Sequence, residues 1–286
     1  PLPTPNGVIK EREFLIYKHE DISFELSPLP GLSKETLEQA EQQISPYLAH
    51  LQAMKNSDFS CYDLTSPLFN LINNTERLYP SVLFCLEQYL FIKCQIYKQD
   101  KPIKVHHLIA DIKSNNHFID GEVYKCKIGK YSIQEEIKIL KKILTEHSIN
   151  LRLDGNRKLS QHQLAKYFPL ISLNDHSCID YFEEPLENLF NYQGASFPLA
   201  LDESFHSFEQ LVQSNYYVIK SIIYKPTIMG GVSTLLNFIK TSPIKGLPIS
   251  LSSSCEGHVG HDFLKLLACY IDSIGPGARH GLVHIE

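Results

Sequence analysis

The stretch VYKCKIGKYSIQEEIKILKKILTEHSINLRLD, residues 123–154, contains the pattern that decides the fold. Residues 123–128 and 151–154 form short apolar runs typical of strands, and residues 133–146 have the composition and spacing of a helix. Two strands joined by a helix pair in parallel. The same alternation continues from Val105 and predicts roughly seven or eight strands over about 175 residues. This number of strands favours a closed (β/α) barrel. An open sheet is the alternative.

The N-terminal part of the chain has a different pattern. Residues 13–17 and 22–26 are strand-like runs separated by a polar turn, which predicts a hairpin. Ser33 is placed to cap a helix that ends near Met54, and a second helix is expected over residues 79–96. We therefore expect a small α+β domain over residues 1–100, a barrel over 101–275 and a C-terminal segment, 276–286, that returns toward the first domain.

The composition is that of a globular protein, with 286 residues, 43% hydrophobic and 21% charged. The net charge of −5 and the lack of long charge runs argue against a nucleic-acid or membrane partner. Seven scattered cysteines, an odd number, fit reduced thiols better than a disulfide framework. We therefore expect a cytoplasmic protein, and a monomer.

Lys125 and Lys127 lie two residues apart in the first strand of the opening stretch. Side chains at positions i and i+2 of a strand point to the same face. If that face is a barrel interior, both ammonium groups are desolvated and each lowers the pKa of the other, which prepares a lysine to act as a base. The alternative is an exposed strand that carries two solvated lysines.

Polar residues follow five later strands at their carboxyl ends, and these ends form one mouth in a barrel. Three of the groups are acidic and begin at Asp154, Glu183 and Asp202; the others are Lys225 and the serines 252–254. Each acid taken singly could instead be a helix cap. Three carboxylates that converge need a cation, and oxygen ligands with open positions suit Mg²⁺.

Taken together, these motifs resemble the enolase superfamily, in its muconate-lactonizing branch. The similarity is closest to the o-succinylbenzoate synthase family of the proteobacterial type and extends over about residues 24–282. It is carried by Lys125-x-Lys127, Asp154-Gly155-Asn156, Glu183-Glu184-Pro185, Asp202-Glu203-Ser204, Lys225-Pro226, Ser252–Glu256 and the run from Leu26 to Glu38. The resemblance implies an α/β fold, a (β/α)7β-type barrel with a smaller N-terminal α+β capping domain.

The resemblance also implies roles for single residues. Asp154, Glu183 and Asp202 would hold Mg²⁺, with Mn²⁺ as a substitute, and Glu203 and Asn156 would support them by hydrogen bonding. The catalytic lysines would be Lys127 as the base, Lys125 as its charged neighbour and Lys225 across the barrel. The residues expected near the substrate are Arg12, Arg152, Ser252, Ser253, Ser254, Gly281 and Leu282.

Arg12 belongs to residues 7–12, which resemble the mobile gating loop of the family's capping domain. In this interpretation its guanidinium meets a carboxylate of the substrate. The alternative is a solvated surface arginine.

The reaction implied is a Mg²⁺-dependent syn dehydration by a carbon–oxygen lyase (hydro-lyase). It converts 2-succinyl-6-hydroxy-2,4-cyclohexadiene-1-carboxylate, a small-molecule carboxylate, to o-succinylbenzoate in menaquinone biosynthesis. Within the superfamily the alternatives are an N-succinylamino acid racemase and a dipeptide epimerase, for which Lys225 would be the second base. Alternatives of another class are a Schiff-base lyase with Lys225 as nucleophile and a barrel without catalytic activity.

Overall fold

The computed structural model divides into two compact units. It describes residues 2–4, 7–9, 11–53, 78–97, 102–114, 116–171, 178–187, 197–205, 218–241 and 246–283. Unit 1 comprises Pro1–Pro102, Tyr224–Ser242 and Leu251–Ile274, and unit 2 comprises Ile103–Ile223, Pro243–Ser250 and Gly275–Glu286. These boundaries differ from the expected domain ranges 1–100, 101–275 and 276–286, which stay a prediction.

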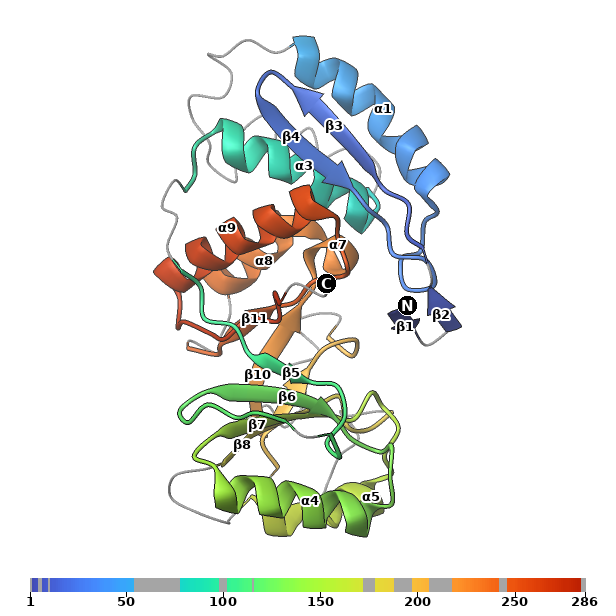
Figure 1. The fold of residues 1–286 in the computed structure, drawn as a ribbon. Coiled ribbons are helices and arrows are strands. Elements are labelled where there is room, and N and C mark those ends of the chain that lie inside the picture. The colour runs from blue at the N-terminus through green and yellow to red at the C-terminus, as the bar shows by residue number, and fades with distance from the viewer. Residues whose placement is uncertain are drawn as a thin grey trace. The chain divides into compact units, whose positions relative to one another are not determined.

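A hairpin and two helices form the N-terminal part of unit 1 (Figure 1). β3 (Leu15–His19) pairs antiparallel with β4 (Ile22–Leu26), which confirms the predicted hairpin. α1 (Leu37–Ala53) and α3 (Pro80–Lys93) pack against it around a core that includes Phe24, Leu26 and Ile44. β1 (Leu2–Thr4) and β2 (Gly7–Ile9) pair as a second hairpin, so the expectation of a loop over residues 7–12 was wrong for residues 7–9.

Among the described residues, unit 1 contains three more helices, and two of them are held at their N-termini by buried glutamates. They are α7 (Pro226–Met229), α8 (Gly231–Thr241) and α9 (His258–Ile274). Glu87 of α3 accepts hydrogen bonds from the backbone N–H groups of Val232 and Ser233, the latter at 3.0 Å. Glu25 of β4 accepts from Gly257 at 2.7 Å and Gly260 at 2.9 Å. The first N–H groups of a helix lack hydrogen-bond acceptors within the helix and carry partial positive charge. A carboxylate at this position accepts their hydrogen bonds and offsets that charge.

Unit 2 is built on a curled sheet of seven strands in the order β11-β10-β9-β8-β7-β6-β5. All neighbouring strands from β5 to β10 pair in parallel, as the strand–helix alternation predicts. The strands are β5 (His107–Ile109), β6 (Val123–Lys127), β7 (Asn150–Asp154), β8 (Cys178–Glu183), β9 (Leu199–Leu201), β10 (Ile219–Tyr224) and β11 (Ile249–Leu251). The last residues of β10 and β11 are assigned to unit 1.

The helices of unit 2 begin where capping residues occur in the sequence. α4 (Ile133–Glu146) matches the predicted helix, and Ser132 caps it by accepting from the N–H of Glu135. α5 (Gln161–Ala165) begins with a capping box formed by Ser160 and Gln163. The short 3₁₀ helix η2 (Phe168–Leu170) follows it. Both α4 and α5 lie on one side of strands β6–β8 in Figure 1.

The C-terminal segment links the two edges of this sheet. His280 pairs with Val105, just before β5, and its carbonyl accepts from the N–H of His106 at 3.1 Å. The carbonyl of Arg279 accepts from the hydroxyl of Ser250, in β11, at 2.8 Å. This short segment therefore contacts the sheet at both edges. Among the described residues, β11 and β5 do not pair with each other directly.

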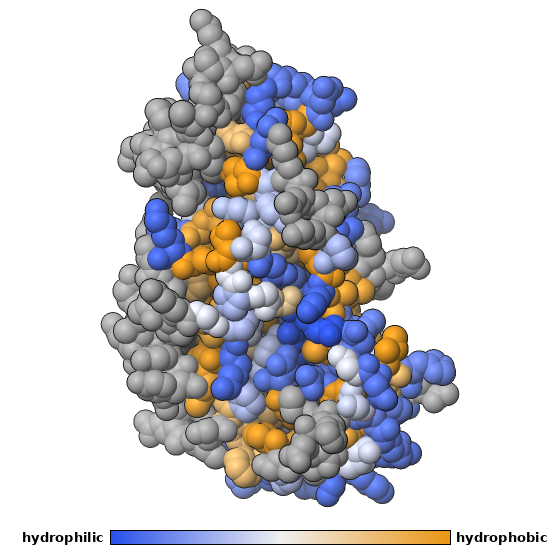
Figure 2. Space-filling view, turned by 90° about the vertical axis from the view of Figure 1, so that its left-hand side faces the viewer, coloured by the Kyte–Doolittle hydropathy of each residue, from blue (hydrophilic) through white to orange (hydrophobic). Residues whose placement is uncertain are grey.

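The strand–helix alternation also predicts helices over residues 186–192 and 207–213, and the first of these lies mostly, the second wholly, outside the described residues. No helix in the described part of the chain is long and apolar enough to cross a membrane. On the face seen in Figure 2, hydrophobic residues lie in separate patches between hydrophilic ones.

The carboxylate of Glu87 gives a testable pH dependence. Burial raises its pKa from 4.5 to about 7, while its hydrogen bonds act in the opposite direction. The folded protein therefore binds this proton more tightly than the unfolded chain, so the stability from Glu87 is present below pH 4.5 and is lost as the pH rises through about 7. Glu87→Gln should reduce the difference between the unfolding free energies at about pH 5 and pH 8, measured with urea.

The control for this measurement is Glu41→Gln, because Glu41 is exposed on α1. The other buried carboxylates are common to all three proteins and cancel in the comparison. The same pH difference in wild type and Glu87→Gln would contradict the assignment.

Candidate active site

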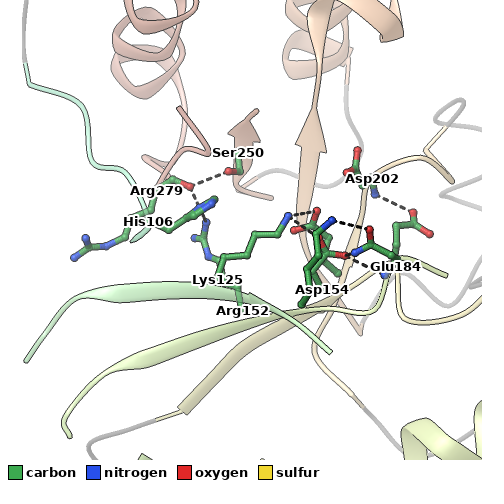
Figure 3. Close-up of polar contacts among 11 residues, drawn as sticks. His106, Lys125, Arg152, Asp154, Glu184, Asp202, Ser250 and Arg279 are labelled. Carbon is green, nitrogen blue, oxygen red and sulfur yellow. Dashed lines mark hydrogen bonds and ion pairs between the residues drawn. The ribbon is translucent and has the colours of Figure 1, made fainter. Parts of the chain in front are cut away.

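Three buried carboxylates lie at the carboxyl ends of neighbouring strands in unit 2 (Figure 3). Asp154 ends β7 and is in register with Glu183, which ends β8. Asp202 directly follows β9, whose Ala200 is in register with Glu183. Their exposed fractions are 8%, 2% and 4%. The structure therefore places the three predicted acids on adjacent strand ends.

The ammonium group of Lys125 lies among these carboxylates. Its Nζ atom is 2.6 Å from Oε1 of Glu183 and 3.0 Å from Oδ2 of Asp154. Burial acts to lower the pKa of Lys125, but the charges of Glu183, Asp154 and Asp202 outweigh burial and raise it. The prediction that the two lysines lower each other's pKa is therefore wrong for Lys125, because the nearest charges are carboxylates.

One ammonium group does not balance three carboxylates. The pKa of Glu183 is raised from 4.5 to about 7, because burial and the charges of Asp154 and Asp202 outweigh the opposing effect of Lys125. Desolvation and like charge both disfavour the ionised form of these acids, and a divalent cation would favour it.

The donor set fits Mg²⁺ in chemistry, although the side chains are not arranged around an ion. Among the described residues, no three His, Cys, Asp or Glu side chains form a group that could hold a metal. Asp154, Glu183 and Asp202 offer buried carboxylate oxygens from adjacent strand ends, which are the ligands that Mg²⁺ prefers. Lys125 contacts two of them, so an ion bound there would compete with its ammonium group.

Lys127, the expected base, ends β6 opposite Asp154 in the sheet register. It is exposed, whereas Lys125 is half-buried, so neither of the two alternatives considered from the sequence, two buried or two solvated lysines, holds for the pair. Its Nζ donates to Oδ1 of Asn156 at 3.3 Å. Asn156 in turn donates its side-chain amide and its backbone N–H, the latter at 3.0 Å, to Asp154. Asn156 therefore connects the exposed lysine to a carboxylate of the cluster.

Glu184 holds the turn that carries Asp202, a role that the sequence interpretation did not assign. Its Oε1 accepts from the N–H groups of Asp202 and Ser204, both at 2.9 Å, and its Oε2 accepts from the Ser204 hydroxyl at 2.8 Å. Glu184 is buried, whereas Glu203, the predicted supporting acid, is half-buried. The signal for Glu184 was present in the Glu183-Glu184-Pro185 motif, whose second acid was left without a role.

Arg152 is part of a buried network on the same face of β7 as Asp154. Its Nε donates to Asp180 at 2.7 Å, and its Nη1 donates to the Arg279 carbonyl at 2.8 Å. Nη1 also lies 3.1 Å from Nδ1 of His106, whose pKa is lowered to about 2 by burial and by the charge of Arg152, so this ring is neutral and can accept. Arg152 thus has protein partners at two nitrogens, and its contact with substrate stays a prediction.

In unit 1, Arg12 connects two backbone segments. Its Nη1 and Nη2 donate to the carbonyls of Ser254 and Ser27. The neighbouring Ser253 hydroxyl donates to Oε2 of Glu256 at 2.6 Å, and the Ser254 N–H donates to the same atom at 2.7 Å. Arg12 and Glu256 thus fix residues 252–254, the serine loop. Contact of Arg12 and of these serines with substrate stays a prediction.

The turn after Lys225 is tied to the same glutamate. Lys225 directly follows β10, is half-buried and donates its backbone N–H to the Met229 sulfur at 3.1 Å. Two residues later, the Thr227 hydroxyl donates to Oε1 of Glu256 at 2.5 Å. Glu256 therefore links the start of α7 to the serine loop, a role that the sequence interpretation also missed.

The other expected substrate contacts are differently exposed. Ser252 is half-buried and donates its N–H to the Tyr224 carbonyl at 3.0 Å. In unit 2, Gly281 is half-buried, and Leu282 is only 3% exposed. Their roles stay predictions.

Comparison with known proteins shows which fold this is. No protein-family model matches the sequence. The chain is 29% identical to o-succinylbenzoate synthase of Pasteurella multocida, covering 85% of this chain and 73% of that protein. It is 27% identical to the Haemophilus influenzae synthase, covering 94% and 82%. The crystal structure of o-succinylbenzoate synthase from Thermosynechococcus elongatus, complexed with Mg in the active site, superposes with a TM-score of 0.70 at 21% identity, covering 98% and 88%.

The chain has the fold of the solved o-succinylbenzoate synthase and is similar in sequence to o-succinylbenzoate synthases over most of its length. The predicted fold class is thereby confirmed. A dipeptide epimerase from Enterococcus faecalis superposes with a TM-score of 0.63 at 17% identity, covering 91% and 80%. That likeness concerns the fold alone.

Removal of Lys125 tests the charge balance of this synthase homologue. Lys125→Met leaves the buried carboxylates without their ammonium partner, and breaking a buried ion pair costs about 3 kcal/mol or more. We expect that loss in urea unfolding with EDTA present, and a larger stabilisation by Mg²⁺ in the variant than in wild type. Lys142→Met, which removes an exposed pair with Glu146, is the control. Equal unfolding free energies of Lys125→Met and wild type in EDTA would contradict the stabilising role assigned to Lys125.

A second prediction separates Glu184 from Glu203. Glu184→Ala removes three hydrogen bonds from the turn that carries Asp202. Because residues that orient a metal ligand typically contribute about 10- to 100-fold in affinity, Mg²⁺ binding measured by calorimetry should weaken by that factor. Glu203→Ala is the matched variant and should bind Mg²⁺ nearly as wild type does. The reverse order of affinities would show that Glu203 supports the ligands.

Proposed function

We propose that this protein is an o-succinylbenzoate synthase. It dehydrates 2-succinyl-6-hydroxy-2,4-cyclohexadiene-1-carboxylate to o-succinylbenzoate, a step of menaquinone biosynthesis. The observation that carries the proposal is the cluster of three buried carboxylates on successive strand ends, with the lysine pair of β6 beside it. Relatives named o-succinylbenzoate synthase, matched over most of both chains, support this substrate.

In this proposal Asp154, Glu183 and Asp202 hold one Mg²⁺ ion. Bound there, the ion supplies Lewis-acid stabilisation of the charge that develops on the substrate carboxylate. Lys125 keeps one positive charge next to Asp154 and Glu183 when the ion is absent. Asn156 and Glu184 fix the directions of Asp154 and Asp202 through their hydrogen bonds.

Lys127 acts as the base. It accepts the proton from the ring carbon α to the substrate carboxylate, and the electron pair of the broken C–H bond enters the ring. The same ammonium group then donates a proton to the departing hydroxyl on the same face, so that water leaves and the ring becomes aromatic. One side chain thus serves as acid and base for a syn elimination. The hydrogen bond to Asn156 Oδ1 at 3.3 Å would hold the Lys127 amine before substrate binds.

The remaining assignments concern charge and substrate contacts. We propose that Lys225 stays protonated and stabilises the negative charge of the reacting ring. The serine loop, residues 252–254, would bind the polar groups of the substrate, and its conformation is fixed by Glu256.

We also propose a cytoplasmic monomer. The described cysteines 85, 94, 126, 255 and 269 are free thiols, as expected in a reducing compartment. Mn²⁺ is expected to replace Mg²⁺, because both ions accept octahedral oxygen ligands.

Activity of wild type and Lys127→Ala tests the proposal. With the cyclohexadiene substrate and Mg²⁺, we expect wild type to form o-succinylbenzoate and the variant to lose about 1000-fold or more in kcat, because proton transfer loses its base. The assay follows the absorbance of the aromatic product. Lys138→Ala, which changes an exposed lysine on α4, is the control.

Three further measurements distinguish the alternatives. Mg²⁺ binding should survive in Lys127→Ala, because Lys127 has no contact with the carboxylate cluster except through Asn156 among the described contacts. Preference for N-succinylamino acids would indicate a racemase instead. Inactivation by borohydride in the presence of substrate would indicate a Schiff base on lysine. A near-wild-type rate in Lys127→Ala would disprove the assigned base.

A further inference from the structure

The loop after Lys127, residues 128–132, is short and held at both ends. At its start, the N–H of Ile128 donates to the Asp154 carbonyl at 2.9 Å, so β6 stays paired with β7 one residue beyond Lys127. At its end, Ser132 caps α4. Gly129 between them has a φ of +81°, a left-handed conformation that glycine adopts without strain. The direction of the chain just after Lys127 therefore depends on how this loop is held.

A single carboxylate, that of Glu136, holds the middle of the loop. Oε1 of Glu136 accepts from the N–H groups of Lys130 and Tyr131, both at 2.8 Å. Oε2 accepts from the N–H of Gly129 at 3.0 Å and from the hydroxyl of Tyr167. Three consecutive backbone N–H groups thus converge on one side chain.

The environment of Glu136 makes this contact strong. The residue is 0% exposed, and its two oxygens together accept four hydrogen bonds. Burial and Glu136 both raise the pKa of Tyr167, so its hydroxyl stays protonated and remains a donor. If Glu136 lost its acceptor oxygens, three N–H groups and one hydroxyl would lose their partner together.

We propose that Glu136 is a positioning residue, which fixes the loop after β6 and thereby the direction of Lys127. This inference rests on the proposed function, because it takes Lys127 as the base. A base must lie within hydrogen-bonding reach of the proton it removes, and an error of about 1 Å in such a position can cost about 100-fold in rate. The exposed Lys127 side chain has few contacts to correct such an error, as its described hydrogen bond is the one to Asn156.

The structure provides a nearly isosteric test, Glu136→Gln. Replacing either oxygen by an amide NH₂ places a donor against at least one backbone N–H, because each oxygen accepts from at least one. The matched control is Glu135→Gln, one residue earlier in α4, where the carboxylate is exposed and pairs with Lys113 at 2.7 Å. Tyr167→Phe removes one donor to Glu136 and leaves the three N–H contacts in place.

Two readouts decide the proposal. Amide hydrogen exchange of residues 129–131 reports on the loop without any substrate, and steady-state kinetics of the dehydration separate kcat from KM. We expect Glu136→Gln to exchange these amides faster and to lose roughly 10- to 100-fold in kcat, with KM changed by no more than about twofold. The substrate deuterium isotope effect should increase, because proton removal becomes slower. Glu135→Gln should match wild type in every measurement.

Each outcome has a defined meaning. A folded Glu136→Gln variant with wild-type kcat, or with unchanged amide exchange, overturns the positioning role. If this variant does not fold, Tyr167→Phe decides: we expect faster exchange at Gly129 and a smaller loss of kcat, and wild-type values of both overturn the proposal. Should wild type itself lack dehydratase activity, the proposed function fails, whereas faster exchange in Glu136→Gln would still establish how the loop is held.

Discussion

The burial of three carboxylates on adjacent strands is the constraint on which the rest of the site depends. Parallel pairing fixes Asp154 beside Glu183 and brings Asp202 to the next strand end, so their separation is set by the sheet. Removed from water, such groups repel one another and tend to take up protons, as the raised pKa of Glu183 indicates. Lys125 offsets part of this charge, and the proposed divalent cation would offset more of it.

Buried or half-buried glutamates organise the backbone around this cluster and elsewhere in the chain. Each accepts hydrogen bonds from backbone N–H groups of a loop or of the first turn of a helix. Glu184 holds the turn of Asp202, and Glu136 holds the loop after Lys127. In unit 1, Glu256 fixes the serine loop, while Glu25 and Glu87 hold the first turns of α9 and α8. The functional side chains therefore lie on segments whose shape is set by acids that need not touch substrate.

Much of the fold and of the candidate site was predictable, because the strand–helix alternation and the polar residues at strand ends are visible in the sequence. Asp154, Glu183 and Asp202 could be found since each follows an apolar run of β-type residues. The different burial of Lys125 and Lys127 could not be predicted. Both residues lie on the same face of one strand, and only tertiary contacts decide which of them is buried. Glu136 was also hidden, since an acid in the first turn of a helix is common for electrostatic reasons alone. Its inward direction depends on the loop that it binds.

The most direct measurement of the central claim is the anomalous diffraction of a crystal soaked with Mn²⁺ at a concentration that supports turnover. One strong peak is expected in contact with carboxylate oxygens of Asp154, Glu183 and Asp202, at about 2.2 Å from each. In the same crystal, the Nζ atom of Lys125 should lie farther from Oε1 of Glu183 than the 2.6 Å described above. A peak at another site, or none at this cluster in an active crystal, would contradict the account.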